Sequence, residues 1–251
     1  MLPRSLLQAF APISLHEMDD VALQFRMDTK YMFNAGKLED LLQHLHDGYR
    51  LLEVAGMRGV DYATRYYDTA GLKHYFDHHN GRSFRSKVRA RCYGSGGLCV
   101  LEVKRRTGRG GTDKRRTPLA TMPMGLDRGQ QAFAALHSGC NEPLAPVLDN
   151  AFHRLTLVHR ERLERLTIDT QITFMRNGRE AALPGLVVAE LKEGRTGHGS
   201  PFAAAMRQWA VAPASFSKYC IGTALTNPAL KRNMFKPVLI QAARAANQLR
   251  A

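Results

Sequence analysis

The sequence predicts an α+β fold in which one antiparallel β-barrel is surrounded by helices. Nine runs have the length and composition of strands, and most follow one another through short connections. The glycine clusters Gly94–Gly97 and Gly108–Gly111 each lie between two such runs, as expected of hairpin connections. In several runs, charged side chains occupy alternate positions, which places them together on one face of the sheet.

Strands are predicted, in chain order, at Val21–Tyr31, Tyr49–Val54, Val60–Thr69, Arg82–Tyr93, Leu98–Thr107, Thr112–Leu119, Asn150–Arg160, Arg162–Thr173 and Leu186–Glu193. Helical patterns fall at Ala35–His46, Asp127–His137, Pro201–Ala210, Ser217–Thr226 and Pro237–Arg250. Long strands in series joined by short turns favour an antiparallel sheet with the helices packed around it.

The composition is that of a globular protein: of 251 residues, 44% are hydrophobic and 23% are charged. Without a repeat or linker, we expect one domain over residues 1–251, ending in a helix at about 237–250. No stretch approaches the roughly 18 apolar residues of a membrane span. The four cysteines show no CxxC spacing, which favours a reducing, cytoplasmic compartment over a disulfide scaffold.

Charge is the unusual feature of the chain. It has 36 Lys and Arg against 22 Asp and Glu, a formal net charge of +14. Such an excess indicates a polyanionic partner, which could be nucleic acid, an acidic membrane surface or free phosphate compounds. One predicted strand carries four bases on a single face, namely Arg85, Lys87, Arg89 and Arg91. Because four like charges in a row repel one another, we expect an anion to lie against them.

The same alternation recurs in other predicted strands. The charged faces are Arg26, Asp28 and Lys30; Glu102, Lys104 and Arg106; Lys114 and Arg116; Arg165, Thr167 and Asp169; and Glu190 and Lys192. For a single strand, the simpler explanation of such a charged face is that it is the solvent-exposed side of an amphipathic sheet. Since five or six strands share a face dominated by Arg and Lys, a barrel with the bases inside is favoured. Such an interior suits a linear polyanion and is too narrow for duplex DNA.

Eight short motifs follow one another between about residues 20 and 222. They are Arg26-Met-Asp-Thr-Lys-Tyr31, Thr64-Arg-Tyr-Tyr-Asp-Thr69, Lys87-Val-Arg-Ala-Arg-Cys-Tyr93, Leu101-Glu-Val-Lys104, Phe152-His-Arg154, Arg165-Leu-Thr-Ile-Asp-Thr170, Val188-Ala-Glu-Leu-Lys192 and Phe216-Ser-Lys-Tyr219. Through these motifs the chain resembles the VTC domain, the polyphosphate polymerase module of the triphosphate tunnel metalloenzyme (CYTH-like) superfamily. The resemblance implies an eight-stranded tunnel domain, with its core at about residues 20–222, that elongates inorganic polyphosphate from ATP with Mn²⁺ or Mg²⁺.

The resemblance also implies roles for single residues. Catalytic contacts with phosphate would come from Lys30, Arg89, Arg91, Lys104, Arg154, Arg165 and Lys218. Further phosphate-binding bases are expected at Arg26, Lys87, Arg116 and Lys192. Glu190 is the expected metal ligand, with an internal ion pair as the alternative; Glu102 is a second candidate, for which that alternative is stronger. Arginine suits phosphate because its planar fork binds two oxygens, and a carboxylate-held divalent cation offsets phosphate charge.

Three reactions fit such a site. Transfer of the γ-phosphate of ATP to polyphosphate is the main expectation; hydrolysis of tripolyphosphate or nucleoside triphosphates, and non-catalytic binding of polyphosphate or RNA, are the alternatives. A terminal phosphate, with its second pKa near ~6, is largely ionised at neutral pH and needs no strong general base. A hydrolase benefits from extra carboxylates that activate water, and the inward acids are few. No aromatic side chain lies on the basic face of residues 85–91, which disfavours nucleic acid as a partner.

Two further expectations concern context. Eukaryotic members of the family carry an inositol-phosphate-sensing domain before the tunnel and membrane helices after it, and neither is expected here. A separate membrane partner protein would then couple synthesis to translocation, holding a cytoplasmic chain at the inner face of a membrane. The histidine-rich stretch His74–His79 is expected to be a solvated loop or helix end, and residues 108–114 lack the spacing of a P-loop.

Overall fold

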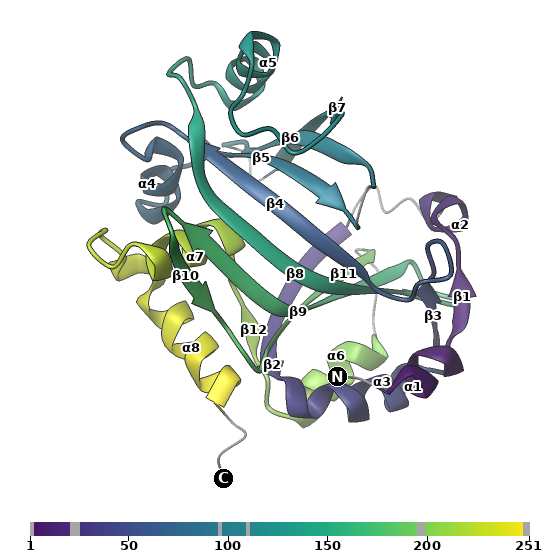
Figure 1. The fold of residues 1–251 in the computed structure, drawn as a ribbon. Helices are drawn as coiled ribbons and strands as arrows, with labels where there is room; N and C mark the ends of the chain where they lie inside the picture. The colour runs from purple at the N-terminus through teal and green to yellow at the C-terminus, as the bar shows by residue number, and fades with distance from the viewer. Residues whose placement is uncertain (1–2, 21–25, 95–96, 109–110, 195–198, 248–251) are drawn as a thin grey trace.

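The computed structural model describes residues 3–20, 26–94, 97–108, 111–194 and 199–247, which form one curved sheet with helices around it (Figure 1). Eight strands have eight or more residues: β2 (Arg26–Asn34), β4 (Val60–Asp68), β5 (Arg85–Tyr93), β6 (Cys99–Arg106), β7 (Thr112–Leu119), β8 (Ala145–His159), β9 (Glu164–Arg176) and β11 (Leu186–Gly194). Neighbours in the order β2-β11-β9-β8-β4-β5-β6-β7 are all antiparallel. The shorter strands are β1 (Ala11–Ile13), β3 (Tyr49–Leu52), β10 (Arg179–Ala182) and β12 (Pro213–Ala214).

This sheet is open in the described residues, because no strand pairing joins β7 at one end to β2 and β12 at the other. The antiparallel α+β fold is therefore confirmed, whereas the closed barrel predicted from the sequence is not seen among these residues. The two ends nevertheless face each other across one concave side. Lys104 of β6 lies close enough to Glu190 of β11 and Lys30 of β2 for their charges to act on its pKa, although β6 and β2 are far apart in the strand order.

Helices lie mainly on the convex side of the sheet and at one end (Figure 1). They are α1 (Arg4–Ala9), α2 (Leu15–Asp20), the 3₁₀ helix η1 (Ala35–Lys37), α3 (Leu38–Leu45), α4 (Lys73–His79), α5 (Arg128–Ser138), α6 (Pro201–Gln208), α7 (Lys218–Thr226), the 3₁₀ helix η2 (Asn233–Phe235) and α8 (Lys236–Asn247). Side-chain caps mark the residues at which several of these helices begin. Asp127 and Gln130 form a capping box at α5, and the hydroxyls of Ser200 and Ser217 accept backbone N–H groups at α6 and α7.

The convex side holds an apolar core between the sheet and helices α3 and α6. Phe33, Leu166 and Val187 come from β2, β9 and β11, and they pack in one cluster with Leu41 of α3 and Phe202 of α6. Each is at most 1% exposed, and burying a side chain of this size contributes about 1.5 to 3 kcal/mol. This core fixes which face of each strand points outward, and hence which residues line the concave side.

Helix α7 packs against the concave side at one end of the sheet. Met32 lies two positions after Lys30, on the same face of β2, and shares an apolar cluster with Tyr219 of α7. The approach is close because Gly222 has no side chain: a Cβ atom there would lie 2.3 Å from Cδ1 of Phe174. The concave side is thus apolar near α7 and charged beyond it.

All nine predicted strands and all five predicted helices have counterparts, although the beginning of Val21–Tyr31 and the end of Pro237–Arg250 lie outside the described residues. The expectation that residues 74–79 form a solvated loop or helix end is wrong in its solvation, although His78 and His79 do lie at a helix end. These residues form α4, where His74 and His79 are each 2% exposed, because helix packing buries them. Within the described residues, no group of three or more metal-ligating side chains is found, there or elsewhere.

A disulfide between Cys92 and Cys99 corrects a second expectation, that the cysteines are reduced. The two residues lie opposite each other on β5 and β6, as the hairpin predicted at Gly94–Gly97 places them, although the sequence analysis did not draw a disulfide from it. Cys140 and Cys220 are free and buried. Within the described part of the chain, no helix combines the length and the apolar character needed to cross a bilayer.

Candidate phosphate-binding site

The alternation predicted on β5 is present. Lys87 and Arg89 are half-buried on the concave side, while Val88 and Ala90 are fully buried on the convex side. Arg91, on the same side as the other bases, is only 7% exposed. The register places further charged residues beside them on β6 and β7. A row of bases therefore lies on one wall of the concave side.

Glu102 of β6 is the anionic centre of this wall. Its Oε1 accepts a hydrogen bond from Arg89, and its Oε2 lies 2.9 Å from both Lys114 Nζ and Arg116 Nε of β7. The side chain is 1% exposed. Burial alone would raise the pKa of Glu102, but the charges of Arg89 and Lys114 outweigh it and hold that pKa well below its usual range. Three bases thus share one permanently charged carboxylate.

Glu190 of β11 is the centre of a second group on the opposite wall. One of its oxygens accepts from Lys30 of β2, and the other lies 2.7 Å from Lys192 Nζ. The same ammonium lies 3.0 Å from an oxygen of Asp28. Burial would raise the pKa of Glu190, yet the charges of Lys30 and Lys192 lower it below its usual range. Two carboxylates therefore converge on the ammonium of Lys192.

A third group is centred on Asp169 of β9, which the sequence analysis placed on a charged face without giving it a role. Its Oδ1 lies 2.5 Å from Arg154 Nε, and its Oδ2 lies 2.7 Å from Arg154 Nη2 and also accepts from Lys218 of α7. Burial raises the pKa of Asp169, but the charges of Arg154 and Lys218 lower it to about 2. In the sequence, the signal that could have found Asp169 was its place on the same predicted face as Arg165. In the structure it lies opposite Arg154 of β8.

Aromatic rings lie among these bases, which the sequence analysis missed. The rings of Tyr62 on β4 and Phe152 on β8 are stacked with centroids 4.9 Å apart. Arg154 lies 4.9 Å from the Tyr62 centroid, Arg91 lies 5.4 Å from it, and Lys218 lies 4.1 Å from that of Phe152. Cation–π contact stabilises charged groups that burial separates from water. The aromatic residues come from neighbouring strands rather than from the basic strand itself.

Lys87, Arg91 and Lys104 lie on the concave side and have no carboxylate contact within the described residues. Burial, reinforced by neighbouring positive charges, lowers the pKa of Lys87 to about 8 and that of Arg91 to about 10. The pKa of Lys104 is lowered too, mainly by burial, although the charge of Glu190 opposes this. Arg91 is buried, Lys87 is half-buried and Lys104 is exposed, so an anion on the concave side could reach all three charges.

The remaining predicted bases lie around these groups. Arg165 is half-buried and pairs in register with Lys192, which places it on the concave side. Arg116 lies at the β7 edge with its side chain 49% exposed. The backbone of Arg26 belongs to β2, but its side chain lies outside the described part of the structure.

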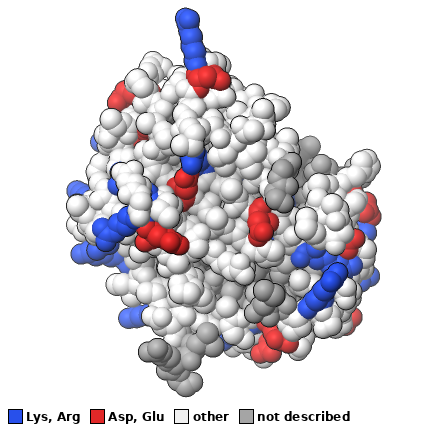
Figure 2. Space-filling view, viewed as in Figure 1, with Lys and Arg blue, Asp and Glu red and all other residues white. Residues whose placement is uncertain are grey.

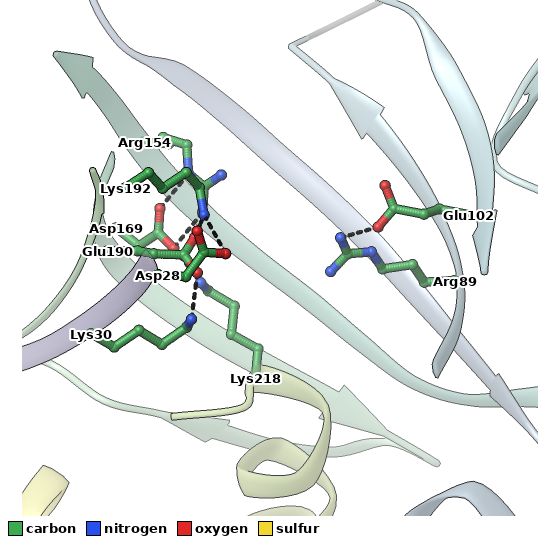
Figure 3. Close-up of polar contacts among 9 residues, drawn as sticks. All are labelled: Asp28, Lys30, Arg89, Glu102, Arg154, Asp169, Glu190, Lys192 and Lys218. Atoms are coloured by element: carbon green, nitrogen blue, oxygen red, sulfur yellow. Dashed lines mark hydrogen bonds and ion pairs between the residues drawn. The ribbon is translucent and has the colours of Figure 1, made fainter. Parts of the chain in front are cut away.

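Figure 3 shows the groups of Glu190 and Asp169 on one wall and the Arg89–Glu102 pair on the other. On the face seen in Figure 2, Lys and Arg are scattered among uncharged and acidic residues and form no continuous basic patch. The fold therefore gathers many of its bases on the concave side.

The carboxylates differ in how well they suit a divalent cation. Both oxygens of Glu102 contact bases, three in all, and both oxygens of Glu190 contact bases as well, namely Lys30 and Lys192. Glu190 has the better place for a divalent cation, because a second carboxylate, that of Asp28, contacts the same ammonium of Lys192, whereas the described contacts of Glu102 are all with bases. Mg²⁺ is commonly held by one or two carboxylates, with water and substrate phosphates as its other ligands.

Comparison with known proteins places the chain in a family. None of the curated proteins matches the sequence. Among solved structures, HpAC1 of Hippeastrum, described as having a dominant triphosphatase activity, is 13% identical; the match covers 80% of this chain and 96% of that one, with a TM-score of 0.48. A Vibrio parahaemolyticus protein is also 13% identical, with coverages of 78% and 96% and a TM-score of 0.47. The Pct1 RNA triphosphatase of S. pombe is 12% identical, with coverages of 84% and 91% and a TM-score of 0.31.

Likeness at this level is too low to bear on chemistry. The family model is more informative, because the model of the VTC domain matches residues 25–227, most of the chain. This range contains every predicted site residue and all eight motifs quoted above. The chain therefore belongs to the VTC domain family.

Proposed function

We propose that this protein is a polyphosphate polymerase, which transfers the γ-phosphoryl group of ATP to the end of a growing inorganic polyphosphate chain. The observation that carries the proposal is a set of concave-side bases without carboxylate contacts among the described residues, set between three paired carboxylates: Arg91 is buried, Lys87 is half-buried and Lys104 is exposed. A linear polyanion of small cross-section matches a concave side lined from both walls. In this view the eight long strands act as a tunnel around the chain.

Phosphoryl transfer asks little covalent chemistry of a protein, because in-line positioning and charge neutralisation supply most of the catalysis. Arg154 and Arg91 lie near each other over the same aromatic pair, and their planar guanidinium groups suit paired phosphate oxygens. Lys30, Lys87 and Lys104 supply point charges that phosphate oxygens can share. These contacts would hold the acceptor end and the γ-phosphate in line.

The state of the inward carboxylates favours transfer over hydrolysis. Asp169, Glu190 and Glu102 each contact two or more bases, and the pKa of each is lowered. A carboxylate with a lowered pKa is a weak general base, whereas a hydrolase benefits from a group that activates water. A polyphosphate end is already ionised and needs no such group.

Glu190 and Asp28 would hold the Mn²⁺ or Mg²⁺ that the family resemblance implies. When bound, such an ion bridges phosphate oxygens and offsets their charge. Phosphate oxygens that engage Lys30 and Lys192 would release Glu190 from its ion pairs. We therefore expect metal and phosphate to bind together rather than separately.

The test incubates the purified protein with ATP and Mn²⁺, and separately with Mg²⁺, and resolves the products by gel electrophoresis and ion-exchange chromatography. Long-chain polyphosphate with ADP in proportion supports the polymerase. Orthophosphate without polymer would show a hydrolase instead. Tight binding of polyphosphate without any turnover, lost in Arg89→Ala with Arg91→Ala, would show a binding module.

The variant Glu190→Gln separates the metal role from phosphate binding. We expect loss of metal-dependent turnover, while metal-free affinity for tripolyphosphate is retained or increased because Lys30 and Lys192 lose their counter-charge. Glu180→Gln, an exposed change of the same charge on β10, is the control. Unchanged turnover in Glu190→Gln contradicts the metal role.

A further inference from the structure

Asp169 lies where β8, β9 and α7 meet. Its side chain is 4% exposed, and its two oxygens bind Arg154 through Nε and Nη2 while one of them also binds Lys218. The three residues come from three different elements (Figure 3). One buried carboxylate thus fixes two cations that the sequence alone keeps far apart.

We propose that Asp169 is a positioning residue: it holds the guanidinium of Arg154 and the ammonium of Lys218 side by side as one clamp for a phosphate group. The inference deepens the proposed function, since it assumes only that a phosphate chain lies on the concave side.

The contacts of the two cations leave each of them able to bind a ligand. Arg154 uses Nε and Nη2 for Asp169, and its Nη1 has no hydrogen bond within the described residues. Lys218 has three donors, of which the Asp169 contact uses one. Both cations also lie over one ring, with Lys218 4.1 Å and Arg154 5.2 Å from the centroid of Phe152. Two like charges held this close need a counter-charge, which Asp169 supplies.

A purely structural role for such a carboxylate is exemplified nearby by Asp68 of β4. Asp68 is fully buried, accepts backbone N–H groups of His74 and Tyr75 at the start of α4, and accepts from the hydroxyl of Tyr219. Within the described residues Asp68 forms no ion pair with Lys or Arg. Asp169 instead contacts Lys218, the residue before Tyr219 in α7, and Arg154, and its described contacts are with these two bases. The two aspartates therefore hold the first turn of α7 in chemically different ways.

The charges around Lys218 explain what Asp169 contributes. The charged groups that act on this ammonium are Asp169 from β9, Arg154 from β8 and Arg91 from β5. Burial, together with the charges of Arg154 and Arg91, lowers the pKa of Lys218 to about 8, and Asp169 opposes this lowering. Without Asp169, the ammonium would lose its proton nearer to neutral pH, and the clamp would lose one of its two charges.

The experiment measures tripolyphosphate affinity by calorimetry, without metal, between pH 6 and 9.5. An opposite charge at contact distance shifts a pKa by about 1 to 3 units, so in Asp169→Asn the loss of affinity should begin about 1 pH unit lower than in the wild type. In a Lys218→Arg background the guanidinium stays charged, and Asp169→Asn should then cause no displacement. An unmoved profile in the single variant, or the same displacement in the Lys218→Arg background, would overturn the proposal.

Two controls separate positioning from folding. Tyr219→Phe removes the hydrogen bond between α7 and Asp68 without changing any charge. We expect a lower unfolding free energy and an unchanged pH profile of tripolyphosphate affinity. A displaced profile would show that weaker packing of α7 alone produces the effect, and it would overturn the proposal. If Asp169→Asn does not fold, Asp169→Glu tests the proposal instead. It should keep the wild-type pH profile, because the charge is retained, and lower kcat about tenfold, because the longer side chain displaces Arg154 and Lys218. An unchanged kcat there would contradict positioning. If the wild type makes no polymer, the binding profiles still test Asp169 independently.

Discussion

Replacing Lys87 with methionine should stabilise the folded protein and lower its affinity for phosphate ligands. Lys87 is half-buried near Lys104, Arg89 and Lys30, without a carboxylate contact in the described residues. Its pKa is about 8, against 10.5 for an isolated lysine. That difference corresponds to about 3 kcal/mol against the charged form. Since the side chain keeps contact with solvent, which screens part of the cost, we expect Lys87→Met to raise the unfolding free energy at pH 7 by about 1 to 3 kcal/mol.

The pH dependence gives this prediction its sign. The lysine carries its proton in both folded and unfolded chains below pH 8, so the penalty is complete there. It fades between about 8 and 10.5, where the folded chain has lost the proton and the unfolded chain is losing it. The gain in Lys87→Met should therefore shrink over that window in urea unfolding curves at pH 7, 9 and 10.5. Lys231→Met, at an exposed position, is the control and should stay within about 0.5 kcal/mol. A destabilised Lys87→Met at pH 7, or a gain independent of pH, would refute the reasoning.

Three further outcomes are expected. Glu102→Gln leaves three bases without their buried counter-charge and should lower the unfolding free energy by about 3 kcal/mol in urea titrations, recovered in part by added tripolyphosphate; a loss below about 1 kcal/mol would show that the ion pairs are incidental. Gly222→Ala places a Cβ atom against the ring of Phe174 and should cost about 1 to 3 kcal/mol; an unchanged melting curve would contradict the close packing of α7. Reduction of Cys92–Cys99, which closes a short loop, should lower the unfolding free energy by about 2 kcal/mol, and identical curves with and without reductant would argue against the bond.

Much of the fold follows from local patterns in the sequence. Thr112–Leu119 was predicted with the bounds that β7 has, after the glycine cluster Gly108–Gly111 that marks a hairpin connection. Irregularities within strands and pairings between distant strands were harder to predict. The irregularity near Gln171, whose φ is 52°, interrupts the pairing of β8 and β9. Before the irregularity, odd-numbered residues of β9 such as Asp169 face the concave side. After it, the even-numbered residues Ile172 and Phe174 do so and pack in one cluster with α7. Whether β7 pairs with β2 depends on long-range geometry, which periodicity does not encode.

The site was predictable where its residues share a strand. Alternation placed Lys87, Arg89 and Arg91 on one face, and the burial pattern of β5 agrees. It could not say which acids neutralise which bases, because those contacts join strands and helices far apart in the sequence. Asp169 was passed over for this reason, since its partner Lys218 lies on α7. The roles given to these residues in catalysis remain predictions.

The sharing of each inward carboxylate among several bases has a consequence for how variants are interpreted. When alanine replaces one base, such as Arg154, the acid that it faced loses a partner in a place poorly reached by water. Lost turnover then reports two things at once, a missing substrate contact and a less stable chain. Rates from an alanine scan of the concave side therefore become informative only beside an unfolding curve for every variant. A paired change such as Arg89→Met with Glu102→Leu keeps the net charge, but it still leaves Lys114 and Arg116 without their shared carboxylate, so it needs its own unfolding curve as well.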